Sequence, residues 1–382
     1  MSKELQTLIL AYRVVFLERE LPEFRESYSA SDPERLMKLA AYHAVRPVLY
    51  QALKKVDRKD VLTDRLQLFT VQMALRNKLY GKETLRLAGI FKRAGIEVLP
   101  YKGCLFTEKL YWGQHFRESG DMDIVIRDKG RAAEAVALLN GEGYVLQAED
   151  SMEQLLENAQ GREVSLIRSG NEGITFHLDF HWGVNERYNL YHIEAEDYFK
   201  GAHIQPFLGD FCLLPSVEAF FKMLLNHHGG RELWFKLKEL FDFSLFLQRF
   251  SQEEYPLTEW ADEVNMIKIY DRGIALNNML ISGKAEQRSG IEERVILNVW
   301  EKGESYRSQI IPKLKRLFVY FRLQDKNINQ RILFKRFVAY HGAYNPVNEF
   351  PRPFGDRWEF LNFLTKLAII LYKRARGTYK AA

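Results

Sequence analysis

Two aspartates stand one residue apart at the start of the apolar segment DMDIVI, which begins at Asp121. Side chains alternate between the two faces of a β-strand, so Met122, Ile124 and Ile126 share one face. Asp121 and Asp123 then share the other. Two carboxylates this close repel each other unless a cation neutralises them or one is protonated. The pair therefore predicts a cation site with oxygen ligands, which suits Mg²⁺ or Mn²⁺.

A second row of polar side chains occurs in the segment TFHLDFHW, residues 175–182. The apolar residues at its even positions form one face, which leaves His177, Asp179 and His181 on the opposite face. A buried carboxylate without a partner is costly, so a polar row in an apolar strand needs a reason. If this strand lies beside the first, Asp179 completes a cluster of three carboxylates.

Three carboxylates that hold two cations about 4 Å apart are the apparatus of in-line phosphoryl and nucleotidyl transfer. In this interpretation Asp121 and Asp123 bind both ions, while Asp179 binds the catalytic ion and accepts the proton of the attacking group. Simpler interpretations remain open. A D-x-D pair alone is more often a turn or a surface pair, and His177, Asp179 and His181 could form the zinc site of a metallohydrolase.

The segments around these residues predict an α+β protein, with a small mixed β-sheet domain between two helical modules. Apolar residues recur at helical spacing through residues 1–94, and Ser31-Asp32-Pro33 is a typical helix start. Short strands alternate with helices over residues 95–190, which predicts the sheet domain that carries the carboxylates. Helical periodicity returns over residues 191–382.

The composition is that of a globular protein, because 47% of the 382 residues are hydrophobic and 27% are charged. This length suits two or three packed modules. No window reaches about 18 uncharged apolar residues, so we expect no membrane span. Two cysteines are too few for a disulfide framework, which favours a reducing cytoplasm.

Basic residues gather near the C-terminus, although the net charge of +5 is modest. Interleaved with Phe and Tyr, such residues could hold RNA. The simpler interpretation is a set of helices with solvated basic faces and aromatic core faces. The residues concerned are Lys313, Lys315, Arg316, Arg322, Lys326, Arg331, Lys335, Arg336, Lys373, Arg374, Arg376 and Lys380.

The stretch LPYKGCLFTEKLYWGQHFRESGDMDIVI, followed by HLDFHW, resembles the uncharacterised nucleotidyltransferase family of the polymerase-β superfamily. That family has an apolar strand ending in Lys-Gly, a helix, and a segment R-x-S-G-D-[IM]-D before a second apolar strand. The resemblance extends over most of the chain to about residue 250. The matching residues here are Lys102, Gly103, Arg117, Ser119, Gly120, Asp121 and Asp123.

The resemblance implies transfer of a nucleoside monophosphate from an NTP to an acceptor, which is a small molecule, a protein or an RNA. It also implies that Lys102, Gly103, Arg117, Ser119 and Gly120 contact the nucleotide, with Mg²⁺ or Mn²⁺ as the cofactor. The wider superfamily has a serine directly after the turn glycine, and this chain has Cys104 there. The alternative is an inactive nucleotidyltransferase fold used for binding.

Two further expectations follow from the residues. His227 and His228 lie near the end of a predicted helix and could face the cleft, although a structural or exposed position is the commoner one. Mutual repulsion of the carboxylates predicts that Asp123→Asn and Asp179→Asn each abolish transfer yet leave the metal-free protein as stable as the parent.

Overall fold

The computed structural model describes residues 1–148, 152–157, 162–170, 174–185, 189–282, 290–303, 310–325, 330–343, 361, 362, 365 and 369. Five helices come first, as the apolar periodicity predicts. They are α1 (Lys3–Phe16), α2 (Leu21–Ser29), α3 (Pro33–His43), α4 (Arg46–Lys55) and the long α5 (Val61–Arg93). The predicted helix start is confirmed, because the Asp32 side chain accepts from the backbone N–H of Arg35 ahead of Pro33.

The sheet follows α5 and has the strand order β1-β2-β5-β4-β3. Only the β2–β5 pair is parallel; the other neighbours are antiparallel. The strands are β1 (Val98–Pro100), β2 (Met122–Ile126), β3 (Val145–Leu146), β4 (Glu163–Ser169) and β5 (Thr175–His181). Between them lie α6 (Gly103–Leu110), the 3₁₀ turn η1 (Lys129–Arg131), α7 (Ala132–Gly141) and α8 (Met152–Glu157).

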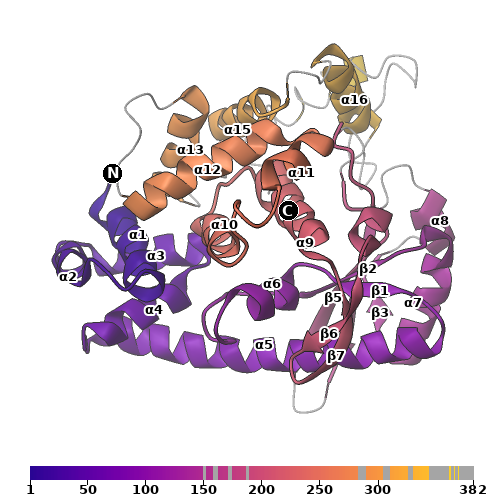
Figure 1. Ribbon diagram of the computed structural model, residues 1–382, viewed down its shortest axis with the longest axis horizontal. Coiled ribbons are helices and arrows are strands. Elements are labelled where there is room, and N and C mark those ends of the chain that lie inside the picture. The colour runs from indigo at the N-terminus through magenta and orange to yellow at the C-terminus, as the bar shows by residue number, and fades with distance from the viewer. Residues whose placement is uncertain are drawn as a thin grey trace.

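The two faces of the sheet pack against different cores. The even-numbered residues of β2 and β5 join Leu87 and Phe91 of α5 and residues of α7 in one buried cluster. Figure 1 shows α5 running along the whole length of the sheet domain. The opposite face, which carries Asp123, contributes Val125 to the main core of the protein. The apolar and polar rows seen in the sequence therefore correspond to the two faces of one sheet.

The region expected to be helical after residue 190 contains a β-hairpin, which the periodicity did not predict. Strands β6 (His203–Phe207) and β7 (Asp210–Leu214) pair around the turn Leu208-Gly209, where both residues have positive φ. Positive φ at both central residues is the conformation that a two-residue hairpin turn requires. Leu208 can adopt it because its side chain packs onto Gly81 of α5, where a Cβ would lie 2.3 Å from Leu208 Cδ1.

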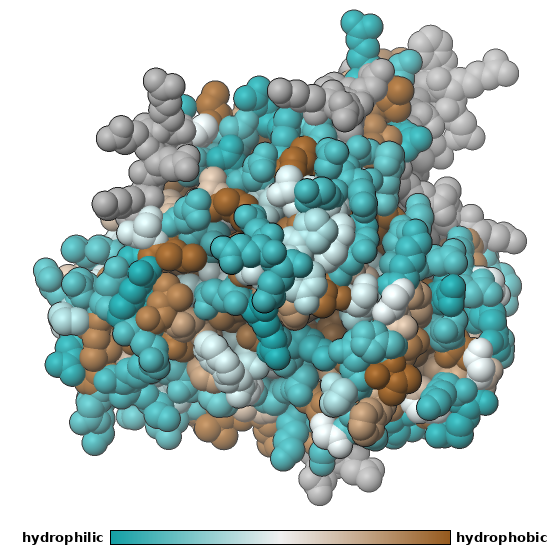
Figure 2. Space-filling model, viewed as in Figure 1, coloured by the Kyte–Doolittle hydropathy of each residue, from teal (hydrophilic) through white to brown (hydrophobic). Residues whose placement is uncertain are grey.

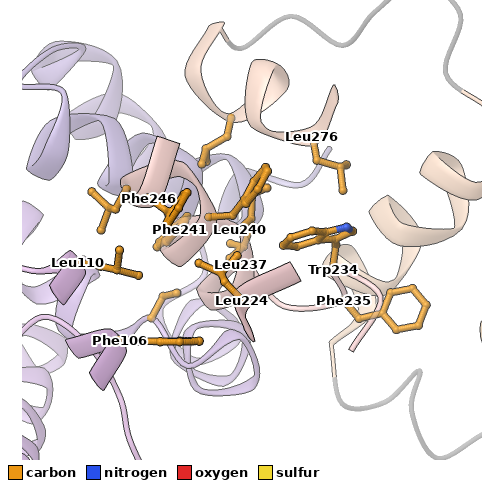
Figure 3. Close-up of a cluster of buried hydrophobic side chains, with 14 of the residues drawn as sticks. Phe106, Leu110, Leu224, Trp234, Phe235, Leu237, Leu240, Phe241, Phe246 and Leu276 are labelled. Atoms are coloured by element: carbon orange, nitrogen blue, oxygen red, sulfur yellow. The ribbon is translucent and has the colours of Figure 1, made fainter. Parts of the chain in front are cut away.

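The rest of the described C-terminal region is helical. It comprises the 3₁₀ turn η3 (Ala195–Phe199), α9 (Val217–Leu224), a π-helical turn (Leu225–Arg231), α10 (Leu237–Arg249), α11 (Leu257–Glu263), α12 (Ile267–Ser282), α13 (Ile291–Lys302), α15 (Ile310–Arg322) and α16 (Gln330–Ala343). Figure 3 shows the centre of the main core, where Phe106 and Leu110 of α6 face Phe241 and Phe246 of α10. Helix α6, which begins at Gly103, is thereby anchored to the C-terminal helices.

The surface in view is mostly hydrophilic, with hydrophobic side chains in small groups (Figure 2). Among the described residues, no helix has the length and apolar character needed to cross a membrane.

Candidate active site

Strands β2 and β5 bring the carboxylates together. Their parallel pairing sets Asp123 directly opposite Asp179. One ligand atom each of Asp123, Asp179 and His181 can be chosen so that all three lie within 4.8 Å of one another. Such a group has the dimensions of a single cation site. The expected pairing of Asp123 with Asp179 is present, and His181 joins them as a ligand that the carboxylate interpretation left out.

Asp123 is held between two cationic groups. The Lys102 Nζ lies 2.8 Å and the His181 Nε2 lies 3.0 Å from the same Asp123 Oδ1. The carboxylate is 3% exposed. Burial alone would raise its pKa, but Lys102 and the bond to His181 outweigh burial and lower the pKa below the ordinary value. The contacts therefore favour the ionised form of Asp123, and Lys102 and His181 both lie beside its Oδ1.

His181 is bound on both sides by carboxylates. Its Nε2 faces Asp123, and its Nδ1 lies 2.7 Å from Oε2 of Glu163, the residue paired with it on β4. Burial and the charge of Lys102 lower the pKa of His181, but the bonds to Asp123 and Glu163 raise it above its usual value overall. Glu163, in turn, has a strongly lowered pKa despite its burial, chiefly because of its bond to His181. Glu163 is a site residue that the sequence did not indicate.

Asp179 makes fewer polar contacts than Asp123 among the described residues. It is half-buried, and the hydroxyl of Ser165 on β4 donates to its Oδ1 at 2.6 Å. Ser165 pairs directly with Asp179 in the sheet, so the contact follows from the strand register. Asp179 is thus the more accessible of the two facing aspartates.

Asp121 lies just before β2 and is outside the group whose ligand atoms fall within 4.8 Å of one another. Burial raises its pKa, and the negative charges of Asp123 and Asp179 raise it further, while Lys102 lowers it. Its carboxylate is therefore within electrostatic reach of both other aspartates. A bound cation would relieve this repulsion, so the residues present fit the cation that the sequence pattern implies.

The Lys102-Gly103 turn closes the site at the start of α6. Lys102 has φ 58 and ψ −131, a strained conformation for a residue with a side chain. A Cβ added to Gly103 would lie 3.3 Å from the carbonyl oxygen of Asp121 and 3.4 Å from Oδ2 of Asp123. Glycine is needed because the backbone passes this close to the carboxylates. The Sγ of Cys104, which is buried, lies 3.7 Å from the hydroxyl of Thr84 on α5.

The loop before β2 positions the remaining predicted residues. Ser119 is buried and directs its hydroxyl toward the carbonyl oxygen of Asp121 at 3.4 Å, while Gly120 is exposed. Arg117 differs from expectation. Its guanidinium is 4% exposed and forms an ion pair with the fully buried Asp242 of α10, with Nη2 2.9 Å from Oδ2. Its donors are occupied inside the protein by Asp242 and by the carbonyl oxygen of Gly103, so they support the loop, and a nucleotide contact of Arg117 stays a prediction.

Arg231 is a further site residue that the sequence did not reveal. It ends the π-helical turn, and its Nη2 lies 3.8 Å from Oε1 of Glu163. Its side chain is 37% exposed, so a cationic group stands at the accessible border of the site. Nothing in the local sequence links Arg231 to β4; only the packing of the C-terminal helices over the sheet brings them together.

His177 points to the same face of β5 as Asp179, but it is exposed and is not part of the three-residue group. Residues four apart on a strand are separated by about 13 Å, at roughly 3.3 Å per residue. A single zinc ion cannot bridge His177 and His181 at bonds of about 2 Å. The geometry therefore disfavours the metallohydrolase trio.

Comparison with protein families finds a match over residues 29–276 to a family described as an uncharacterised nucleotidyltransferase. The matched segment extends from the N-terminal helices through the sheet and the π-helical turn into α12. A search of curated proteins finds no match to the chain.

Proposed function

The chain belongs to this nucleotidyltransferase family, and we propose that it transfers a nucleoside monophosphate from an NTP to an acceptor with the help of a divalent cation. The observation that carries the proposal is the convergence of Asp123 and Asp179 from neighbouring strands, with Asp121 within electrostatic reach. A protein that only binds a partner has no need to maintain this repulsion.

The cation would be held by Asp123, Asp179 and His181, with Asp121 completing the shell. Mg²⁺ or Mn²⁺ fits the oxygen ligands, and the imidazole makes Mn²⁺ the better match of the two. When bound, such an ion lowers the pKa of the attacking hydroxyl and neutralises charge on the triphosphate.

The residues of the chain then account for the rest of the substrate. Lys102 and Arg231 supply positive charge for the triphosphate from two sides, and Ser119 and Gly120 lie in the adjoining loop. The backbone N–H groups at the start of α6 face the same region and favour an anion. Asp179 is the accessible carboxylate that can accept the proton of the acceptor hydroxyl. The oxygen of that hydroxyl attacks the α-phosphorus of the NTP, and pyrophosphate leaves.

The acceptor is a small molecule, a protein side chain or an RNA end. Support for RNA comes from the basic C-terminal helices, but two of their arginines already have partners within the chain. Arg322 bonds Glu292, and Arg316 lies over the Phe235 ring. The other basic residues with described side chains are Arg331, Lys335 and Arg336; Lys326 and the residues beyond 369 lie outside the described part.

The test is to incubate the purified protein with each labelled NTP, Mg²⁺ or Mn²⁺, and fractionated cell extract. We expect label on one acceptor class, abolished by Asp179→Asn and unchanged by the control Asp57→Asn, whose side chain is 88% exposed. Labelling that persists in Asp179→Asn would overturn the proposed site. Binding of NTP without any transfer would favour the inactive binding fold.

A further inference from the structure

The π-helical turn carries two histidines that the proposed mechanism does not use. The Nε2 of His228 lies 2.9 Å from Oδ2 of Asp242, and its Nδ1 lies 3.0 Å from Nδ1 of His227. Asp242, His228 and His227 thus form a row of hydrogen-bonded groups. Asp242 and His228 are fully buried, whereas His227 at the end of the row is partly exposed.

The row fixes where the protons lie. Asp242 is an acceptor, because Arg117 lowers its pKa strongly in spite of its burial. His228 Nε2 must therefore carry a proton and donate it. Arg117 already balances the charge of Asp242, so a second buried cation would lack a counter-charge. Burial also lowers the pKa of His228, and its ring is therefore neutral with a lone pair on Nδ1. Two nitrogens 3.0 Å apart need one donor, so His227 Nδ1 carries the proton and its Nε2 is left as a lone pair.

The backbone holds this turn rigidly. A Cβ at Gly229 would lie 2.2 Å from Ile269 Cγ2, and one at Gly230 would lie 3.0 Å from Met266 Cε. The two glycines let the turn pack directly on α12 and the residue before it. π-helical turns often occur at functional sites, where they redirect side chains that an α-helix would place elsewhere.

The π-helical turn that carries the row borders the proposed site, because its last residue, Arg231, reaches Glu163 on β4. The ring of His228 meets the edge of Phe106 in α6, with centroids 5.4 Å apart, one turn after Lys102. Burial lowers the pKa of His227 far below its usual value, and the charges of Lys102 and Arg231 lower it further. Lys102 and Arg231 both belong to the proposed site, so the ring of His227 shares their surroundings.

We propose that Nε2 of His227 accepts a hydrogen bond from a hydroxyl or N–H group of the substrate. Within the described part of the chain, the only hydrogen bond of the His227 ring is the one to His228, which leaves Nε2 without a partner on a partly exposed residue. The inference rests on the proposed transfer function and adds a substrate contact to it.

The kind of group that binds there follows from the tautomer. A lone pair repels the oxygens of an ionised phosphate, which are acceptors only, so the triphosphate is left to the cationic side chains. An uncharged donor is required, and the sugar or base of the nucleotide and the hydroxyl of the acceptor both offer one. His228 and Asp242 act through His227 as positioning residues, because they set its proton rather than touch the substrate.

The first measurement is the tautomer itself. In protein with ¹⁵N-labelled histidine, long-range ¹H–¹⁵N spectra distinguish a protonated Nδ1 from a protonated Nε2, and the signals are assigned by their loss in His227→Gln. We expect His227 to be protonated at Nδ1 alone at neutral pH. A proton on Nε2 would overturn the proposal, and this readout does not depend on any activity.

The second measurement separates the two sources of the donor. His227→Ala, His227→Gln and the exposed control His203→Ala are compared for Mg²⁺·NTP binding and for labelling of the extract. We expect His227→Ala to lose about three- to tenfold in one readout, the range of one net hydrogen bond. Gln offers an amide oxygen near the same place and should restore part of the loss.

A loss in NTP affinity assigns the donor to the nucleotide, and a loss in labelling at unchanged NTP affinity assigns it to the acceptor. Parental values in both readouts for His227→Ala would overturn the proposal. A parent protein that neither binds Mg²⁺·NTP nor labels any fraction would instead overturn the transfer function, and it is recognised before any variant is made.

Discussion

Replacing the two facing aspartates should have unequal effects on the metal-free protein. Asp123→Asn removes the charge that compensates Lys102 and His181, which are both within 3.0 Å of one oxygen of Asp123 and buried around it. Removing one partner of a buried ion pair costs about 3–5 kcal/mol, because the remaining charge is left unpaired. Asparagine keeps the volume and one acceptor oxygen, so we expect about 3 kcal/mol.

Asp179→Asn should cost less than about 1 kcal/mol, because Asp179 is half-buried and its one hydrogen bond in the described structure comes from Ser165, which an amide oxygen can also accept. This prediction differs from the expectation from sequence, in which neither substitution lowers the stability of the metal-free protein. That expectation counted repulsion between the carboxylates but not the two cationic groups beside Asp123.

Urea unfolding of the parent and both variants in EDTA measures the difference. Adding Mg²⁺ or Mn²⁺ should then stabilise the parent by mass action and stabilise neither variant to the same extent. Equal, small losses in the two variants would refute the claim that Lys102 and His181 depend on Asp123. A larger loss in Asp179→Asn would refute the assignment of Asp179 as the accessible ligand.

Three further predictions concern the same site. Burial lowers the pKa of His181, but its two carboxylate partners raise it above the ordinary value near 6.5. The stabilising contribution of His181 to the metal-free protein is therefore complete below that value and is lost as the pH rises through the raised pKa. Urea unfolding from pH 6 to 9 should show this loss, and the His181→Gln variant should lack it. Gly103→Ala should destabilise the protein by about 1–2 kcal/mol and weaken Mn²⁺ binding in a titration, because its Cβ would press on Asp121 and Asp123. Lys102→Met should strengthen Mn²⁺ binding without NTP by about tenfold, since the competing ammonium is gone, while it lowers transfer; weaker Mn²⁺ binding would contradict this.

The sequence predicted which side chains share a face of the sheet better than it predicted the contacts that those side chains make. Strict alternation in β2 and β5 correctly separated the polar face from the apolar one, because both strands are covered by α5 on one side only. The register that sets Asp123 opposite Asp179 depends on which strands pair, and alternation does not contain that information. His181 was visible as a member of the polar row, but its role required Glu163, which lies on a third strand.

Two features of the structure depend on contacts that are distant in the sequence. Arg117 stands in the motif where a phosphate contact is expected, yet Asp242, 125 residues later, takes its guanidinium into the interior. The hairpin around Leu208 was missed because its turn depends on a glycine in α5 that accommodates the leucine side chain. In both cases the deciding contact is far away in the sequence, so no local pattern could reveal it.

The charges around the carboxylates suggest why the metal-free protein tolerates them. Seven ionisable groups gather at the edge of the sheet: Asp121, Asp123, Glu163, Asp179, Lys102, His181 and Arg231. Four are acidic and three are basic, so the cluster is one positive charge short of balance when all are ionised. The shortfall falls on Asp121, whose pKa is raised by burial and by its two acidic neighbours. A divalent ion that binds together with a triphosphate would bring both positive and negative charge to the cluster. The ion would replace Lys102 beside Asp123, and the phosphates would then be the anionic partner of Lys102. In the proposed function the same lysine thus compensates the empty carboxylates and then faces the substrate, and its strained backbone holds it beside Asp123.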